Sequence, residues 1–194
     1  SGLLFIINYS VVGVVKRRFD GTTYSSSVVR APEIQDLLRA QGRQIAVFKL
    51  QGYVFFGTAN RLLEQVRNVV EDSAPRFVLL DFQLVTGLDS SAVLSFTKMK
   101  QIAQVNDMVV IFAALPDRMC SRFAHDFPVS GKVTHWHYAP DLDHGMEWCE
   151  DRLLAREDFL GTITPQLTLK DRIEGMLGSP VQANVMMGYL ERAD

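Results

Sequence analysis

The chain alternates between short apolar runs and longer segments in which apolar side chains are more widely spaced. Nearly continuous apolar runs occur at 45–50, 77–82 and 108–115, and apolar stretches interrupted by polar residues occur at 11–19 and 133–138. Uninterrupted runs of this length are typical of strands that are covered on both faces. The pattern therefore predicts a central sheet of about five strands.

The segments between these runs have the apolar spacing of amphipathic helices. Pro32 opens the first of them and Gly42 closes it, while Thr58 is placed to cap the second. Helices are predicted over 33–40, 58–71, 90–106, 116–126 and 141–156. Because strands and helices alternate, we expect an α/β fold in which four or five helices pack against a mixed, mostly parallel sheet.

The alternating pattern covers residues 9–156 and ends there. Residues 157–194 contain a linker with Gly161 and Pro165, followed by two small amphipathic helices. Two such helices cannot form a core of their own. We expect residues 157–194 to be a helical connector that packs on the main domain or on something beyond it.

The beginning of the chain permits two interpretations. Residues 3–7 are all hydrophobic, and the basic cluster Lys16-Arg17-Arg18 follows shortly after them. Residues 3–7 are either part of a strand, or residues 1–8 are the stump of a last membrane helix whose cytoplasmic flank is the basic cluster. The second interpretation predicts that residues 3–7 do not form a regular central strand.

Composition and charge narrow the class of protein. The formal net charge is −2, so no global basic field attracts the chain to nucleic acid. Cys120 and Cys149 are far apart among apolar helix positions, so we expect two core thiols in a reducing compartment. No stretch approaches the ~20 apolar residues of a membrane helix, which favours a soluble fragment.

The stretch 75–106 combines a buried strand, a polar segment and a helix start. Asp81 is the one charge in the apolar run 77–82 and lies near its C-terminal end. Residues 83–88 are expected to be a loop with Gly87 as its flexible point. Asp89 or Ser90 is placed to cap the next helix. In open α/β sheets, binding sites collect in the loops at the carboxyl ends of strands. This stretch is therefore the first candidate site.

A hydroxyl in the first turn of a helix faces unsatisfied backbone N–H groups, which would hold a phosphate well. Asp89 beside it and Asp81 at the strand end would repel the added negative charge. A phosphorylated serine would therefore change the sign and shape of the exposed surface, which is the property of a switch. The alternative is that Asp89-Ser90-Ser91 is only a good helix cap.

Other sources of chemistry are weaker. The glycine-rich nucleotide motifs and the GxSxG nucleophile motif are absent from the sequence. His135 and His137 flank Trp136 on a strand and point to one face, but a third metal ligand at a recognisable spacing is missing. An enzyme that uses Asp81 with either histidine remains a third class of function and would need a concave pocket.

Two segments of the candidate site resemble a known signature. Leu80-Asp81-Phe82 and the run from Val85 to Ala92 resemble the signature of STAS domains, which occur in bacterial anti-sigma-factor antagonists and in the cytoplasmic tails of SulP anion transporters. In the antagonists the first serine after the aspartate is phosphorylated, and the resemblance carries that role to Ser90. Ala92 departs from the glycine that the antagonists typically have two positions after that serine.

Further segments resemble the transporter branch. The run from Leu3 to Lys16, together with 21–24 and 52–57, is similar to the passage from the last membrane helix into the STAS domain of SulP proteins. Within the tail, 177–180 and 189–192 are similar to the connector before a cyclic-nucleotide-binding-type domain. The resemblance covers about residues 3–156 and extends into the tail only through these short segments.

The resemblance implies a non-enzymatic regulatory or interaction domain at the cytoplasmic face of the inner (plasma) membrane, in a SulP-type transporter of sulfate-class or bicarbonate-class anions. It would act through a loop and helix start comprising Asp81, Thr86, Gly87, Asp89, Ser90 and Ser91. The implied partner is the membrane domain of the same chain, a second STAS copy or a cytosolic regulator. Some STAS domains bind nucleotides near this loop, although the sequence supplies no phosphate cradle, and no cofactor is expected. The alternative is a freestanding anti-sigma-factor antagonist that is switched by phosphorylation at Ser90.

Overall fold

The computed structural model describes residues 13–128 and 135–155. The chain divides into two compact units, Ser1–Asp151 and Arg152–Asp194, and the fold described below is that of the first. The predicted membrane stump at 1–8 and the predicted connector at 157–194 lie outside the described residues. Among the described helices, none has the length and apolar composition that crossing a membrane requires.

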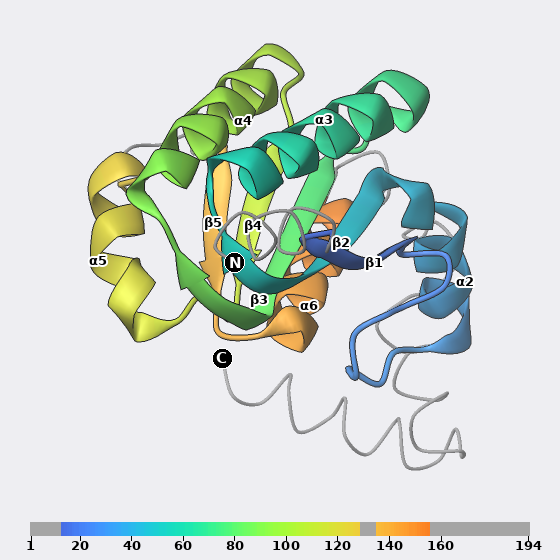
Figure 1. Ribbon diagram of the computed structural model, residues 1–194. Helices are drawn as coiled ribbons and strands as arrows, with labels where there is room; N and C mark the ends of the chain where they lie inside the picture. Colours follow the sequence, from blue (N-terminus) through green and yellow to red (C-terminus); the bar gives the residue numbers. More distant parts are fainter. Residues whose placement is uncertain (1–12, 129–134, 156–194) are drawn as a thin grey trace, which may run out of the picture. The chain divides into compact units, whose positions relative to one another are not determined.

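A mixed five-stranded sheet forms the centre of the domain (Figure 1). The strands are β1 Val15–Asp20, β2 Ile45–Val54, β3 Phe77–Leu88, β4 Val109–Ala113 and β5 Trp136–Ala139. They follow their sequence order across the sheet, with β1 antiparallel to β2 and all other neighbours parallel. The predicted α/β fold with a mixed sheet is confirmed.

Helices cover both faces of this sheet. They are α2 Pro32–Ala40, α3 Phe56–Ser73, α4 Val93–Val105, α5 Asp117–Asp126 and α6 Leu142–Leu154, with short 3₁₀ segments η1 Gly42–Gln44 and η2 Ser90–Ala92. Figure 1 shows α3 and α4 side by side on one face and α6 on the other. Phe48 and Leu80 belong to the core under α3 and α4, whereas Leu79 lies against Gly145 of α6.

The predicted loop at 83–88 is wrong, because β3 continues as a strand to Leu88. β2 extends in the same way to Val54, and the two strands pair in parallel beyond the edge reached by β4, with register shifts that mark bulges. Leu84, Val85 and Thr86 alternate between exposed and buried, which is the two-residue period of a strand. We call this paired extension, 51–54 with 84–88, the β2–β3 ribbon.

Two helix details also differ from expectation. α3 begins at Phe56, two residues before the predicted cap, and Thr58 lies in its first turn, where its Oγ1 accepts the Phe55 N–H at 3.0 Å. Helical spacing from the start at Ser90 places Leu94 on the apolar face of the predicted helix, but its side chain is 54% exposed. The next residue, Ser95, is buried instead.

The two cysteines have different environments. Cys149 is buried on α6, as expected for a core thiol. Cys120 is exposed, and its Sγ lies 3.5 Å from the carbonyl oxygen of Pro116, the residue just before α5. The core prediction for Cys120 is therefore wrong. It rested on the apolar neighbours of Cys120 in the sequence, but the cysteine lies on the solvent side of α5.

Candidate functional site

Asp89 forms the cap that starts the helical segment after β3. Its Oδ1 accepts the backbone N–H of Ser91 at 2.7 Å and the Ser90 hydroxyl at 3.3 Å. Both serine side chains are exposed. Of the two candidates for the cap, the structure therefore selects Asp89, and it leaves the Ser90 hydroxyl at the surface beside a carboxylate.

Ser91 connects this segment to a neighbouring helix. Its Oγ accepts the backbone N–H of Phe56, the first residue of α3, at 3.2 Å. The first N–H groups of a helix lack partners within the helix, so the serine satisfies one of them. The starts of α3 and of η2 are thereby held together at one edge of the domain.

Thr86 and Gly87 lie on the β2–β3 ribbon that leads to this edge. Thr86 is exposed and Gly87 is buried. A Cβ on Gly87 would stand 2.5 Å from the Cε2 atom of Tyr53, so the tyrosine ring lies directly across the glycine. Gly87 therefore permits a close approach between the two strands, which is a packing role rather than the flexible loop point that was expected.

Asp81 faces the other side of the sheet. It is two residues after Leu79 on β3 and shares the face that packs on α6, because side chains two apart on a strand point the same way. Only 1% of its surface is exposed; its Oδ1 accepts the N–H of Gln83, and its Oδ2 lies 3.5 Å from the Nζ of Lys49. The residues from Thr86 to Ser91 are brought together, whereas Asp81 belongs to the α6 side.

Large exposed apolar side chains surround the Ser90 edge. Phe56, at the start of α3, is 47% exposed, and Leu94 lies one helical turn after Ser90. Tyr53 and Leu84 on the β2–β3 ribbon are also exposed. Tyr53 lies over Gly87, on the side of β3 away from Thr86, so we call only Phe56, Ser90 and Leu94 the Ser90 face. Sequence reasoning missed its apolar part, because helical spacing placed Leu94 on the apolar face of its helix and residues 53–56 were interpreted as a short apolar turn or strand.

The histidines of the predicted last strand have structural contacts. The Nδ1 atom of His135 lies 3.2 Å from the carbonyl oxygen of Met108, and His137 stacks on Trp148 with ring centroids 4.1 Å apart. Within the described residues, no group of three or more histidine, cysteine or acidic side chains has metal-binding geometry.

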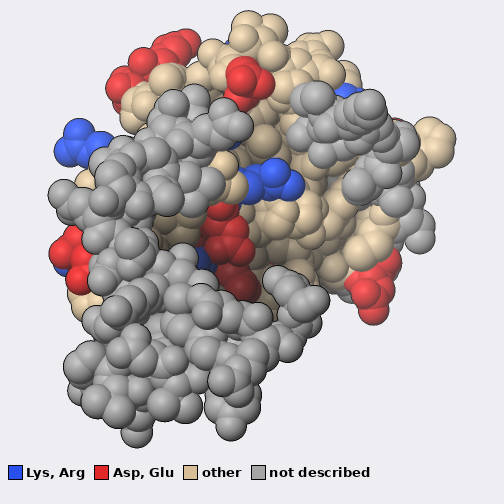
Figure 2. All heavy atoms as spheres, turned by 180° about the vertical axis from the view of Figure 1, so that it is seen from behind, with Lys and Arg blue, Asp and Glu red and all other residues tan. Residues whose placement is uncertain are grey.

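The face covered by α6 carries a polar cluster that sequence reasoning missed. Ser26 donates its N–H and its hydroxyl to the Glu150 carboxylate at 2.8 and 2.5 Å, and Ser27 binds Asp143 in the same way. Arg30 forms an ion pair with Asp151 at 2.8 Å. Seen from behind, acidic side chains lie near the centre of the view (Figure 2). The serine-rich segment 25–30 is therefore a strap across α6, which we call the serine strap.

Tyr24, next to the serine strap, has a raised pKa. Burial is the largest cause, and the negative charges of Asp143 and Asp81 contribute after it. Each of these effects disfavours a phenolate, so Tyr24 stays neutral at physiological pH. The buried carboxylate of Asp81 is thus part of the electrostatic environment beneath the strap.

Comparison with known proteins places part of the chain in a family. Residues 37–125 match the family model described as the STAS domain. The vacuolar basic amino acid transporter VSB1 of Saccharomyces cerevisiae is 25% identical over 159 residues, which cover 77% of this chain and 15% of that protein. The chain therefore spans about 15% of the length of this curated relative.

Solved structures with similar folds include two kinds of protein. One is a sulfate transporter family protein from Wolinella succinogenes, at 17% identity and a TM-score of 0.47, covering 57% of this chain and 88% of that one. Another is the unphosphorylated anti-sigma factor antagonist SpoIIAA, at 16% identity and a TM-score of 0.44, covering 58% and 92%. By the family match, residues 37–125 of this chain form a STAS domain.

Proposed function

We propose that this chain is a non-enzymatic regulatory and interaction domain of a SulP-type anion transporter, at the cytoplasmic face of the inner (plasma) membrane. The Ser90 face is its binding surface, and the membrane domain of the same chain is its partner. The observation that carries this proposal is the exposure of Phe56, whose N–H is bound by Ser91, and of Leu94, one helical turn after a serine whose hydroxyl is at the surface. Contiguous exposed apolar side chains mark interaction sites on soluble domains.

Phosphorylation at Ser90 would act on this surface directly. The added charge of about −1.5 to −2 would stand beside the Asp89 carboxylate and between apolar side chains. Like charges and a strongly hydrated group both oppose burial in an apolar contact. The same face would therefore bind its partner when Ser90 is unmodified and release it when Ser90 is phosphorylated.

The yeast relative supports the association with a transporter. That protein is named as a vacuolar transporter of basic amino acids, and the matched part is 15% of its length. Transport itself would reside in membrane segments outside the matched part. The membrane domain would accordingly determine which solute is transported. Our proposal for the present domain concerns the regulation of transport.

A freestanding anti-sigma-factor antagonist is the second candidate. The exposed Ser90 hydroxyl, held beside a helix start by Asp89, is accessible to a kinase. This exposure supports the antagonist as much as it supports the transporter domain. Such a protein would use the same face to bind a soluble regulator or a second copy of itself. The two candidates therefore differ in the partner rather than in the surface.

The enzyme alternative has less support from the geometry. It requires Asp81 to act together with His135 or His137. Asp81 is buried against Lys49, and His137 is stacked on the Trp148 ring. Each of these groups has a contact that accounts for its position in the fold.

Site-specific photo-crosslinking in the intact protein tests the proposed surface. A photo-reactive residue replaces Leu94 on the Ser90 face, and the matched control replaces Val105, which is 84% exposed at the other end of α4. We expect Leu94, but not Val105, to crosslink to a membrane segment of the same chain. A crosslink from Leu94 to a soluble regulator would favour the antagonist, and equal labelling at both positions would contradict a specific Ser90 face.

A further inference from the structure

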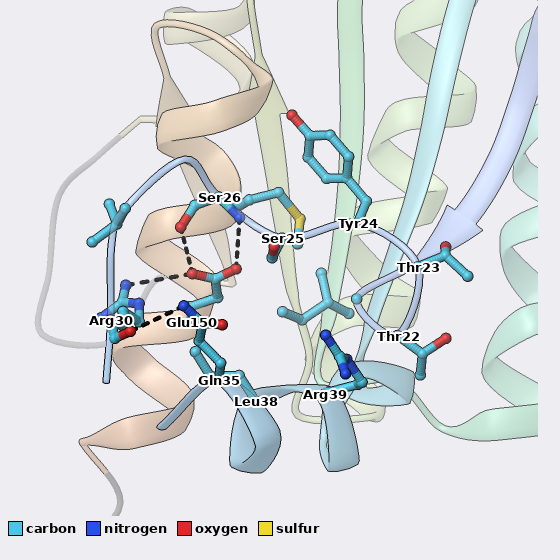
Figure 3. Close-up of a pocket in the computed structure, with 14 residues that line it drawn as sticks. Thr22, Thr23, Tyr24, Ser25, Ser26, Arg30, Gln35, Leu38, Arg39 and Glu150 are labelled. Atoms are coloured by element: carbon cyan, nitrogen blue, oxygen red, sulfur yellow. Dashed lines mark hydrogen bonds and ion pairs between the residues drawn. The ribbon is translucent and has the colours of Figure 1, made fainter. Parts of the chain in front are cut away.

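A small polar cavity lies between the segment after β1, helix α2 and helix α6 (Figure 3). Its volume is about 190 Å³. That exceeds the roughly 10–15 Å³ needed for one water but falls below the ~300 Å³ of the smaller drug-sized pockets. Its walls include Thr22 and Ser25 from the loop, Arg39 from α2, and Arg30 and Glu150 at one side. The cavity thus suits a small polar ligand.

Of the charged side chains that line the cavity, Arg30 and Glu150 are engaged with each other. Two arginines and one glutamate line the cavity, and Arg30 is also paired with the Asp151 carboxylate at 2.8 Å, so Arg30, Glu150 and Asp151 together carry one negative charge. Glu150 is already satisfied, because Ser26 donates two hydrogen bonds to it and Arg30 lies 3.4 Å away. The guanidinium of Arg39, an exposed residue, has no hydrogen bond or ion pair to the described part of the chain. The charge that is available to a ligand is therefore that of Arg39.

Ser25 adds uncharged donors opposite this arginine. Its neighbours Tyr24 and Ser26 use their backbone N–H groups within the fold, on Asp20 and Glu150. Ser25 itself has no hydrogen bond through its N–H or hydroxyl to any described residue. Figure 3 shows Ser25 on the loop and Arg39 rising from α2 toward it. A guanidinium and two unused donors on one cavity are the groups that recognise an oxyanion.

We propose that this cavity is a binding site for a small oxyanion or carboxylate, with Arg39 as its main ligand and Ser25 as a second. The two ligands come from the loop after β1 and from α2, so a bound anion would tie these two neighbouring segments together across the cavity. It is separate from the Ser90 face, none of whose residues lines the cavity. The anion-binding proposal can therefore be correct or wrong whether or not the Ser90 face binds the partner proposed above.

Titration of the full chain with sodium sulfate and, separately, with sodium malonate tests the proposal by calorimetry and thermal unfolding. Sodium chloride at matched ionic strength is the reference. We expect saturable binding and, at ten times the dissociation constant, a rise in Tm of about 3–5 °C. We expect Arg39→Gln to weaken binding about tenfold or more, because it removes a charge-assisted hydrogen bond.

Arg43→Gln is the matched control, since Arg43 is exposed on η1 next to α2 and does not line the cavity. It makes the same change in net charge and should leave affinity unchanged. This control matters because sulfate stabilises many proteins without binding. Ser25→Ala should weaken binding to a smaller extent. Absence of saturable binding, equal affinity in Arg39→Gln and the wild type, or equal loss in Arg43→Gln would each overturn the proposal.

Discussion

Ser90 stands between two groups with opposite effects on an added phosphate. The start of the helical segment offers backbone N–H groups that favour a negative charge, but Asp89 already accepts the N–H of Ser91. A phosphate on Ser90 would compete with that carboxylate and repel it. Modification would therefore alter the surface strongly while the rest of the fold, held by the core beneath β3, keeps its shape.

Replacement of Ser90 by aspartate should separate binding from folding. Because an acid is tolerated in the first turn of a helix, we expect Ser90→Asp to change the Tm by less than about 2 °C. We expect it to weaken partner binding, since it places a second charge beside Asp89 on an apolar surface. Binding is measured by co-purification with the partner, and Ser90→Ala is the control that should bind normally. Undiminished binding by Ser90→Asp would rule out a charge-operated switch.

At the scale of elements, the five strands and the main helices follow from sequence pattern. Residues 45–50, 77–82 and 108–115 were each recognised as strands because burial on both faces requires continuous apolar runs. The β2–β3 ribbon was missed because it extends beyond the edge reached by β4 and is covered on one side only. Its exposed–buried alternation at Leu84, Val85 and Thr86 was the available signal, and Gly87 drew the interpretation toward a loop.

The junction of β1 with the loop depends on one glycine contact. A Cβ on Gly42 would lie 2.3 Å from the backbone carbon of Gly21 and from the backbone nitrogen of Thr22. Backbone atoms cannot move aside as a side chain does, so we expect Gly42→Ala to cost about 3 kcal/mol. The corresponding fall in Tm is about 6–12 °C. Gly13→Ala, whose Cβ would have its nearest neighbour at 3.8 Å, is the control and should shift the Tm by about 2 °C at most.

A pair of residues at the start of α6 makes the stability of the fold depend on pH. The Asp141 carboxylate accepts the backbone N–H of His144 at 2.9 Å and contacts its ring Nδ1 at 2.8 Å. These hydrogen bonds lower the pKa of Asp141, and the ring hydrogen bond raises the pKa of His144 above its usual 6.5. The contribution of His144 to folding stability is therefore complete below about pH 6.5 and is lost as the pH rises through the pKa of His144 in the folded state. The contribution of Asp141 to folding stability is present above about pH 4 and is lost as the pH falls through the lowered pKa of Asp141.

We therefore expect His144→Gln to lower the Tm relative to the wild type more at pH 5.5 than at pH 8.5. Both groups are exposed and salt screens their interaction, so thermal unfolding is best measured at low ionic strength. The backbone hydrogen bond to Asp141 is present in both proteins and cancels in the comparison. The same difference in Tm at both pH values would show that the charge of His144 contributes nothing to stability.

At the scale of the whole molecule, long-range contacts limit what sequence can predict. Asp89 as a cap and Ser90 as an exposed hydroxyl follow from local spacing. The serine strap does not, because Ser26 and Glu150 are 124 positions apart and each looks ordinary in its own segment. The separation of Asp81 from the Ser90 face has the same origin: the loop that was expected to join them is a strand, and Asp81 points to α6.

The central claim is that this domain serves a membrane transporter, and the native size and location of the protein test it most directly. Cells that produce the protein are fractionated and probed with an antibody to this chain. Our account predicts a band in the membrane fraction that is much larger than the 21.8 kDa of the present chain. A soluble band near that mass would contradict it and would make the antagonist, with Ser90 phosphorylation, the function to pursue.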